Sequence, residues 1–113
     1  MLAGQQCTID GDGDQKKDYL YVGDIARANE LALKGGDGAV LNIGTGTGTT
    51  VNEIYRTLSA ATGNTIGPRY GPPREGDVRN FWLDATRAKA VLNWQPAITF
   101  EEGVRLTVAS LRE

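Results

Sequence analysis

The 113-residue sequence contains no histidine and only one cysteine, Cys7. Histidine is the commonest general base and a common metal ligand, so zinc chemistry and Ser-His catalysis lack their usual side chain. A single cysteine cannot close an internal disulfide, and nothing in the sequence therefore points to an oxidising compartment. We expect no metal site in this chain.

Strong net charge and long apolar runs are also missing. The 12 Lys and Arg residues against 14 Asp and Glu residues leave a net charge of −2, which gives little attraction to nucleic acid or to an anionic membrane surface. No apolar run approaches the roughly 18 residues of a bilayer-spanning helix. The first residues lack the basic and apolar regions of a secretory signal. We therefore expect a cytoplasmic protein that binds neither nucleic acid nor membranes.

Apolar patterning predicts short strands alternating with helices. Two short runs, at 8–9 and 19–22, flank an Asp-Gly-rich turn and predict a hairpin. The apolar run at 39–43 is typical of a buried strand, and the prolines within 64–80 indicate an extended segment. Apolar residues at helical spacing predict helices in four segments: 24–34, 51–62, 84–92 and 100–111. This interleaving predicts an α/β fold, α+β-like as an isolated piece.

Polar residues at the expected helix starts indicate how each helix begins. Asp and Thr side chains accept hydrogen bonds from the free amides of a first turn, and a Glu three residues after a Thr completes a capping box. The expected caps are Asp24, Thr50 with Glu53, Asp84, and Thr99 with Glu102.

Glycines at alternate positions in 44–48 form the first candidate for chemistry. A glycine turn between a strand and a helix can present backbone amides to a phosphate. The dinucleotide-binding pattern needs a further glycine where Thr49 stands, and no lysine follows as in a P-loop. The alternative, which we favour, is a tight strand-to-helix turn whose glycines supply positive φ angles.

Alternating acidic residues suggest a calcium loop. Asp10, Asp12 and Asp14 have the spacing of such ligands, but an EF-hand would require Gly and Glu where Gln15 and Tyr21 stand. A solvated turn explains the three aspartates better.

Arginines lie along the proline-rich extended segment. Arg69, Arg74 and Arg79 on a rigid backbone would suit an anionic ligand, because a guanidinium group binds phosphate oxygens in pairs. The alternative for each arginine is simple solvation. None of the four tyrosines is followed by lysine in the Tyr-x-x-x-Lys dyad of short-chain hydride-transfer enzymes. The chain thus carries no catalytic set of its own.

Four segments resemble, in order, the C-terminal part of the extended short-chain dehydrogenase/reductase family. The likeness is to nucleotide-sugar epimerases and dehydratases such as the UDP-glucose 4-epimerases, and it covers nearly all of the sequence. The segments are Lys-Asp-Tyr within 11–28, Leu-Asn-Ile-Gly-Thr-Gly at 41–46, Pro-Pro-Arg-Glu-Gly-Asp at 72–77, and Leu-Asp-Ala-Thr-Arg-Ala at 83–88 with Leu-Asn-Trp-Gln-Pro at 92–96.

The resemblance implies a nucleotide-binding role for three residues. Lys17 and Arg74 would grip a diphosphate, and Asp77 would contact the ribose. Lys17 departs from the family, which usually has arginine there, so the charge is kept but the two-pronged fork is lost.

The resemblance also implies what the chain lacks. Residues 1–113 would be the C-terminal, nucleotide-sugar-binding portion of an epimerase, while the NAD-binding Rossmann part with its Tyr-x-x-x-Lys dyad would precede Met1. We therefore expect the isolated chain to bind no cofactor, to be inactive as an enzyme, and to bind a nucleotide-diphosphate sugar weakly. Its apolar surfaces would contact the missing domain or another copy, by exchange of elements. The alternative is a non-enzymatic interaction or assembly module derived from a degenerate epimerase.

Overall fold

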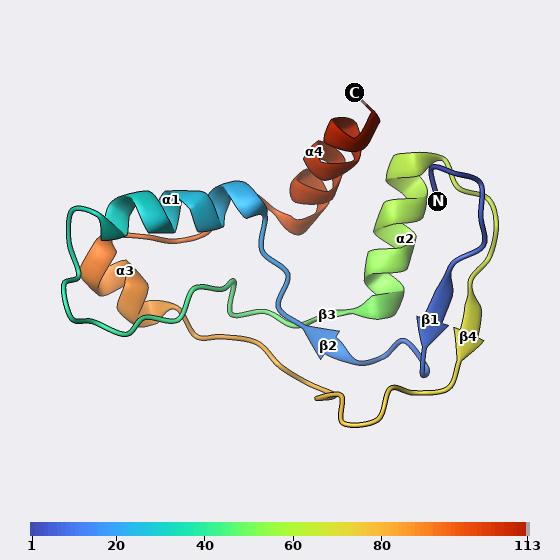
Figure 1. The fold of residues 1–113 in the computed structure, drawn as a ribbon, viewed down its shortest axis with the longest axis horizontal. Coiled ribbons are helices and arrows are strands. Elements are labelled where there is room, and N and C mark those ends of the chain that lie inside the picture. Colours follow the sequence, from blue (N-terminus) through green and yellow to red (C-terminus); the bar gives the residue numbers. More distant parts are fainter. Residues whose placement is uncertain (113) are drawn as a thin grey trace.

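The computed structural model describes residues 1–112, which form four helices and four very short strands (Figure 1). The elements run in the order β1 (Thr8–Asp10), β2 (Lys16–Lys17), α1 (Val22–Ala32), β3 (Thr49–Thr50), α2 (Val51–Thr62), β4 (Arg69–Gly71), α3 (Thr86–Leu92) and α4 (Phe100–Arg112). Each expected helix forms within a few residues of its predicted bounds, and the α/β class is confirmed.

Both strand pairs join residues that are more than 30 positions apart in the sequence. β1 and β4 are parallel, in a register that places Thr8 opposite Arg69, whereas β2 and β3 are antiparallel. The predicted hairpin is therefore wrong, and residues 19–22 form no strand. The turn is tied to α2 instead, because the Asn52 amide donates to the Asp12 carbonyl at 3.1 Å and to the Asp14 carboxylate at 3.0 Å.

The predicted strand at 39–43 is also absent, and the segment is a loop. Leu41 and Ile43 pack against the core, while Val40 points outward and is 83% exposed. No strand among residues 1–112 lies beside this segment to complete a hydrogen-bonded ladder. An apolar run predicts that one side of the segment is buried. A β-strand also needs a neighbouring strand for its backbone hydrogen bonds.

The threonine caps of α2 and α4 are confirmed, whereas Ala85 rather than Asp84 occupies the cap position of α3. The Thr50 hydroxyl accepts a hydrogen bond from the Glu53 amide at 3.0 Å, and the Thr99 hydroxyl accepts one from the Glu102 amide at 3.2 Å. The Asp84 carboxylate accepts from the Thr86 amide at 2.9 Å, at the start of α3. These polar residues satisfy amides that the first helical turn leaves free.

Asp24 is not the expected cap, because α1 begins two residues earlier, at Val22. Its side chain is buried and accepts hydrogen bonds from the amides of Ala97 and Ile98, both at 3.2 Å. Its carbonyl accepts from the indole of Trp94 at 2.9 Å. Asp24 therefore joins α1 to the loop between α3 and α4.

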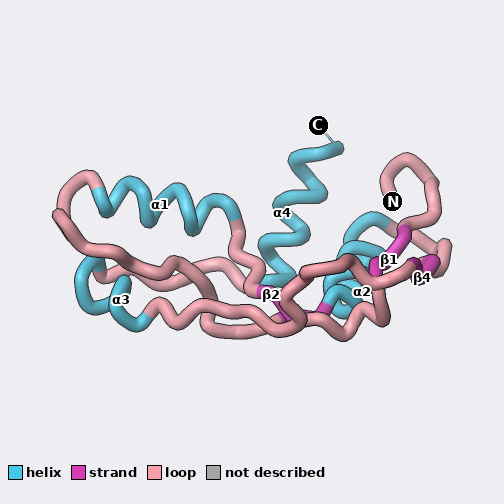
Figure 2. The backbone as a smooth tube through the Cα atoms, turned by 60° about the horizontal axis from the view of Figure 1, so that its bottom comes forward, coloured by secondary structure: helices cyan, strands magenta, loops and turns pink. Residues whose placement is uncertain are grey.

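The core is small and lies where α1 meets α3. Trp94 is completely buried against Ala28 and Ala88. α4 packs separately on α2, and the chain spreads into a flat body with extents of 47 × 36 × 16 Å, much of it loop (Figure 2). Among residues 1–112, no helix combines the length and apolar character needed to cross a lipid bilayer.

Candidate functional site

Lys17 and Asp77, two of the three residues expected to bind a nucleotide, are in direct contact. Lys17 ends β2, and Asp77 lies in the loop between β4 and α3. The Lys17 ammonium donates to the Asp77 carboxylate at 2.8 Å and also to the carbonyl oxygen of Val78. Two segments that are 60 residues apart in sequence are therefore joined by one side chain.

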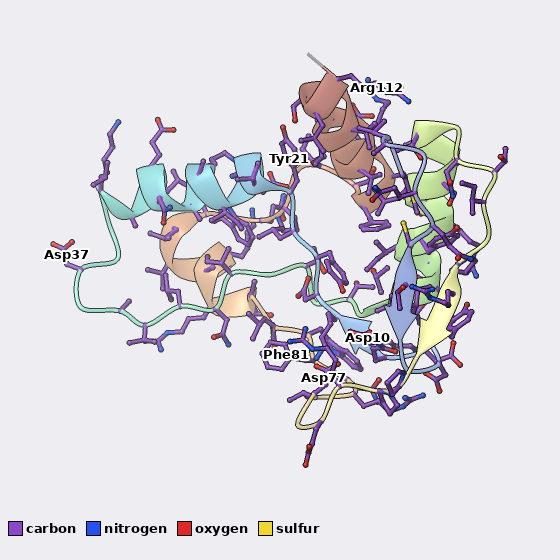
Figure 3. The ribbon with its side chains drawn as sticks, turned by 45° about the vertical axis from the view of Figure 1, so that its right-hand side comes forward. Asp10, Tyr21, Asp37, Asp77, Phe81 and Arg112 are labelled. Carbon is purple, nitrogen blue, oxygen red and sulfur yellow. The ribbon has the colours of Figure 1, made fainter. Side chains whose placement is uncertain are left out.

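Arg74, the third residue, shares a cleft with Asp77. The cleft has a volume of about 520 Å³ and lies where β1 and β4 end and the Pro-rich loop begins. Figure 3 shows Asp10 and Asp77 at this edge of the molecule, far from Asp37 beyond the end of α1. The lining residues are Asp10, Gly11, Asp12, Gln15, Gly71, Pro73, Arg74, Asp77 and Arg79.

Several charged side chains at the cleft form close pairs. The Lys17 hydrogen bond, helped by the positive charges of Lys17 and Arg74, holds the pKa of the Asp77 carboxyl below its ordinary value. Asp77 is therefore an anion at neutral pH and holds the Lys17 ammonium beside the cleft. A carboxylate in this state can accept a hydroxyl hydrogen bond, and the guanidinium of Arg74 can donate to an anion.

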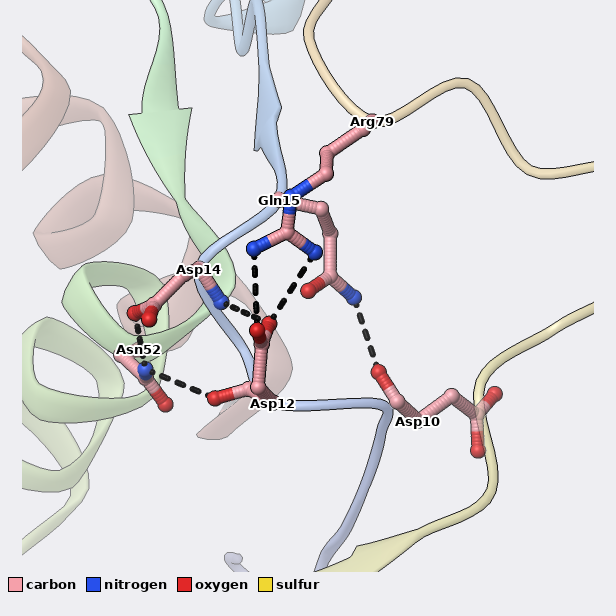
Figure 4. A network of polar contacts seen from close by, with 6 residues as sticks. All are labelled: Asp10, Asp12, Asp14, Gln15, Asn52 and Arg79. Atoms are coloured by element: carbon pink, nitrogen blue, oxygen red, sulfur yellow. Dashed lines mark hydrogen bonds and ion pairs between the residues drawn. The ribbon is translucent and has the colours of Figure 1, made fainter.

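Two of the three alternating aspartates have carboxylates bonded to the protein itself, whereas Asp10 accepts a hydrogen bond from Gln15 with its backbone carbonyl. The Asp12 carboxylate accepts hydrogen bonds from Arg79 at 2.9 and 3.3 Å, and Asp14 accepts from Asn52 (Figure 4). In residues 1–112 no group of three or more His, Cys, Asp or Glu side chains is arranged to hold a metal ion. The arrangement favours the solvated turn over a calcium loop.

The glycine turn at 44–48 is likewise filled by a side chain. The Asp18 carboxylate accepts hydrogen bonds from the amide of Thr45 at 3.0 Å, of Gly46 at 3.3 Å and of Leu83 at 3.1 Å. These are the amides that would otherwise face a phosphate, so the geometry favours the turn over a phosphate loop. Sequence reasoning missed this role of Asp18, whose only signal was its place in Lys-Asp-Tyr at 17–19.

Tyr19, next to the site, has the opposite character from an acid-base tyrosine. Partial burial raises the pKa of its hydroxyl, against a smaller lowering by the charge of Lys17. Proton transfer at neutral pH would require a lowered pKa. Tyr19 therefore does not have the lowered pKa of an acid-base tyrosine.

Comparison with known proteins gives one family and a consistent set of relatives. Residues 1–107 match the family model described as GDP-mannose 4,6 dehydratase. A UDP-glucose 4-epimerase of Mycolicibacterium smegmatis is 40% identical over 113 residues, which are 99% of this chain and 36% of the relative.

Solved structures agree with the sequence comparison. A UDP-glucose 4-epimerase of Thermotoga maritima, crystallised with UDP-glucose, is 51% identical with a TM-score of 0.96, over 99% of this chain and 36% of that one. The UDP-glucose 4-epimerase of Thermus thermophilus in complex with NAD is 36% identical with a TM-score of 0.87, over 98% and 37%. The chain thus spans little more than a third of the length of the relatives it matches.

Proposed function

The chain belongs to the GDP-mannose 4,6 dehydratase family and is a segment of nucleotide-sugar epimerase or dehydratase type, and from this premise we propose that it binds the nucleotide diphosphate of a sugar nucleotide. In the parent enzyme this segment would aim the sugar at the reacting centre. Holding reactants in the right geometry is a large part of enzyme catalysis. The isolated chain would bind the ligand without converting it.

One observation carries the proposal: Arg74 and Asp77 line one cleft, and Lys17, which is 60 residues from Asp77 in sequence, is bonded to Asp77 beside that cleft. Arg74 would donate to the diphosphate with its guanidinium fork, and Lys17 would add a single positive charge. The Asp77 carboxylate would accept a hydrogen bond from a ribose hydroxyl. The solved relative from Thermotoga maritima holds UDP-glucose, which supports a UDP-sugar as the ligand class.

We place NAD in the part of the parent enzyme outside this chain. The Thermus thermophilus relative was solved with NAD, and in such an enzyme NAD supplies hydride transfer. The chain's own glycine turn does not fit a cofactor, because its amides at Thr45 and Gly46 are already bonded to Asp18. The residues of this chain would therefore bind and orient the substrate only.

Calorimetric titration of the 113-residue chain with UDP and UDP-glucose tests the proposal. We expect saturable binding in the millimolar range or tighter, and uridine, which lacks phosphate, should bind at least about tenfold more weakly. Arg74→Ala should weaken UDP binding about tenfold or more, the effect of losing a charge-assisted hydrogen bond.

Arg112→Ala is the matched control, because Arg112 is exposed on α4, outside the cleft, and among residues 1–112 it donates to the Thr62 carbonyl. It should leave UDP binding unchanged. Absence of saturable binding at millimolar UDP would contradict the proposal and favour the interaction module. Epimerase activity of the pure chain with added NAD would contradict its catalytic inactivity.

The second candidate, a non-enzymatic interaction module, is supported by exposed apolar side chains. Leu33, which caps the C-terminal end of α1, and Val40 in the loop after it are 85% and 83% exposed. Exposed apolar side chains that gather into a patch are typical of protein–protein contacts. These exposed side chains could equally contact the other part of the parent enzyme. The ligand titration therefore decides between the two functions.

A further inference from the structure

The cleft contains a second arginine whose partner is the chain's own carboxylate. Arg79 and Asp12 both line the cleft with Arg74 and Asp77. We propose that Arg79 is a second diphosphate-binding residue, and that Asp12 occupies its guanidinium until the phosphate groups of the ligand displace that carboxylate. This inference rests on the proposed function and adds to it a competing group within the site.

The geometry of the pair is that of a ligand contact. Both Nη atoms of Arg79 donate to the two carboxylate oxygens of Asp12, at 3.3 and 2.9 Å (Figure 4). A guanidinium uses the same parallel pair of donors for carboxylates and for phosphates. The Asp12 oxygens therefore stand where two phosphate oxygens could bind.

The charges of the cleft explain why a second guanidinium is needed. Its lining carries three carboxylates, those of Asp10, Asp12 and Asp77, against two guanidinium groups. Lys17 already donates to Asp77 and to the Val78 carbonyl. A diphosphate entering this cleft would meet a lining that is net negative, with Arg74 its main attraction. Transfer of Arg79 from Asp12 to the ligand leaves the net charge of the lining unchanged but gives the diphosphate a second guanidinium donor beside Arg74.

Exchange of partners requires little rearrangement. The side chains of Arg79 and Asp12 are 60% and 54% exposed, and exposed ion pairs contribute little to stability. After release, Asp12 would keep the hydrogen bond that it accepts from the Asp14 amide at 2.9 Å. The Arg79 hydrogen bonds hold the pKa of Asp12 below its ordinary value, so the competitor is charged at neutral pH.

UDP titrations of four forms of the 113-residue chain test the exchange. Asp12→Asn removes the competing charge but keeps an acceptor for the Asp14 amide, so UDP should bind about threefold or more tightly. Arg79→Ala should weaken binding about fivefold or more. In the double variant the gain from Asp12→Asn should vanish, because no guanidinium remains to be released.

A second exposed ion pair supplies the matched control. Arg105 and Glu102 pair on α4, with side chains 63% and 42% exposed, outside the cleft. Glu102→Gln changes the net charge as Asp12→Asn does, and it should leave UDP affinity unchanged. Circular dichroism melting curves of each variant confirm that the fold is kept.

Three results would overturn the exchange. Asp12→Asn could weaken binding or leave it unchanged, which would make the pair a structural support. The gain in UDP affinity from Asp12→Asn could persist when Arg79 is also replaced by alanine. Glu102→Gln could also give the same gain, which would make it a general effect of net charge. If Arg74→Ala abolishes UDP binding while Asp12→Asn and Arg79→Ala leave the UDP affinity unchanged, only this inference fails and the proposed function stands. If neither the natural chain nor Asp12→Asn binds UDP, the proposed function fails with it.

Discussion

At the scale of single residues, the Lys17–Asp77 contact determines the charge state of the site. The Asp77 pKa is lowered chiefly by the hydrogen bond from Lys17. Replacing Lys17 with alanine should therefore raise the Asp77 pKa towards its ordinary value, while Arg74 keeps part of the lowering. A carbon-13 NMR titration of the Asp77 carboxyl would measure this change.

The sign of the pH dependence follows from the lowered pKa. A carboxyl whose pKa is lower in the folded chain stabilises the fold above its unfolded-state pKa, and this stabilisation is lost as the pH falls through the folded value. Acidification should thus release Lys17 from Asp77, and Lys17→Ala should make stability less sensitive to acid. An unchanged Asp77 titration in Lys17→Ala would show that the contact does not persist in solution.

The sequence named three residues that the structure places at or beside one cleft, but it gave little information about hydrogen-bond partners. Lys17, Arg74 and Asp77 could be named from local segments, and the structure brings Lys17 against Asp77 and Arg74 into the same cleft as Asp77. Asp24 was misassigned and Asp18 overlooked, because their amide partners lie 73 and 27 residues away. Local rules for helix caps contain no information about such distant donors.

At the scale of secondary-structure elements, the end of α2 offers a direct test of backbone conformation. Gly63 follows the helix in the left-handed region, with φ 72°, and a Cβ there would meet no atom within 4 Å. Gly63→Ala should cost about 1 kcal/mol of unfolding free energy, because a Cβ disfavours this conformation. Chemical denaturation would measure the loss.

Gly67 is the matched control, because a Cβ there is equally free of contacts and no positive φ is involved. Gly67→Ala should leave stability unchanged or raise it slightly, since alanine restricts the unfolded chain. Equal losses at both glycines would contradict the conformational explanation.

Helices could be predicted well and strands poorly, for one physical reason. The first turn of α2 is capped by the hydrogen bond from the Glu53 amide to the Thr50 hydroxyl. These residues are three apart, so the start of the helix can be predicted from local sequence. A strand is defined by a partner, and the partners of β1 and β2 are β4 and β3. The apolar run at 39–43 had the right composition but has no partner strand among residues 1–112.

At the scale of the whole molecule, the chain is more open than its length requires. Its radius of gyration is 16.3 Å, against about 13 Å for a compact domain of this size. Its accessible surface is 7535 Å², against about 6000 Å² for a typical 12 kDa monomer. The excess surface includes the exposed Leu33 and Val40.

We therefore expect the isolated chain to associate through the segment that follows α1. Sedimentation velocity over a concentration series should show dimers or larger species, and Leu33→Asp with Val40→Asp should shift the population towards monomer. Leu111→Asp is the control, because Leu111 is 69% exposed but lies on α4. A single monomeric species at every concentration would contradict this expectation.

The parallel pairing of β1 with β4 has a consequence for the order of folding. It joins Thr8 to Arg69 across 61 residues, and the cleft lined by Arg74 and Asp77 lies at the end of these two strands. Contacts between distant parts of a chain form slowly, because loop closure must come before any compensating interaction. The cleft is thus completed late in folding. A bound ligand would therefore lower the unfolding rate rather than raise the folding rate.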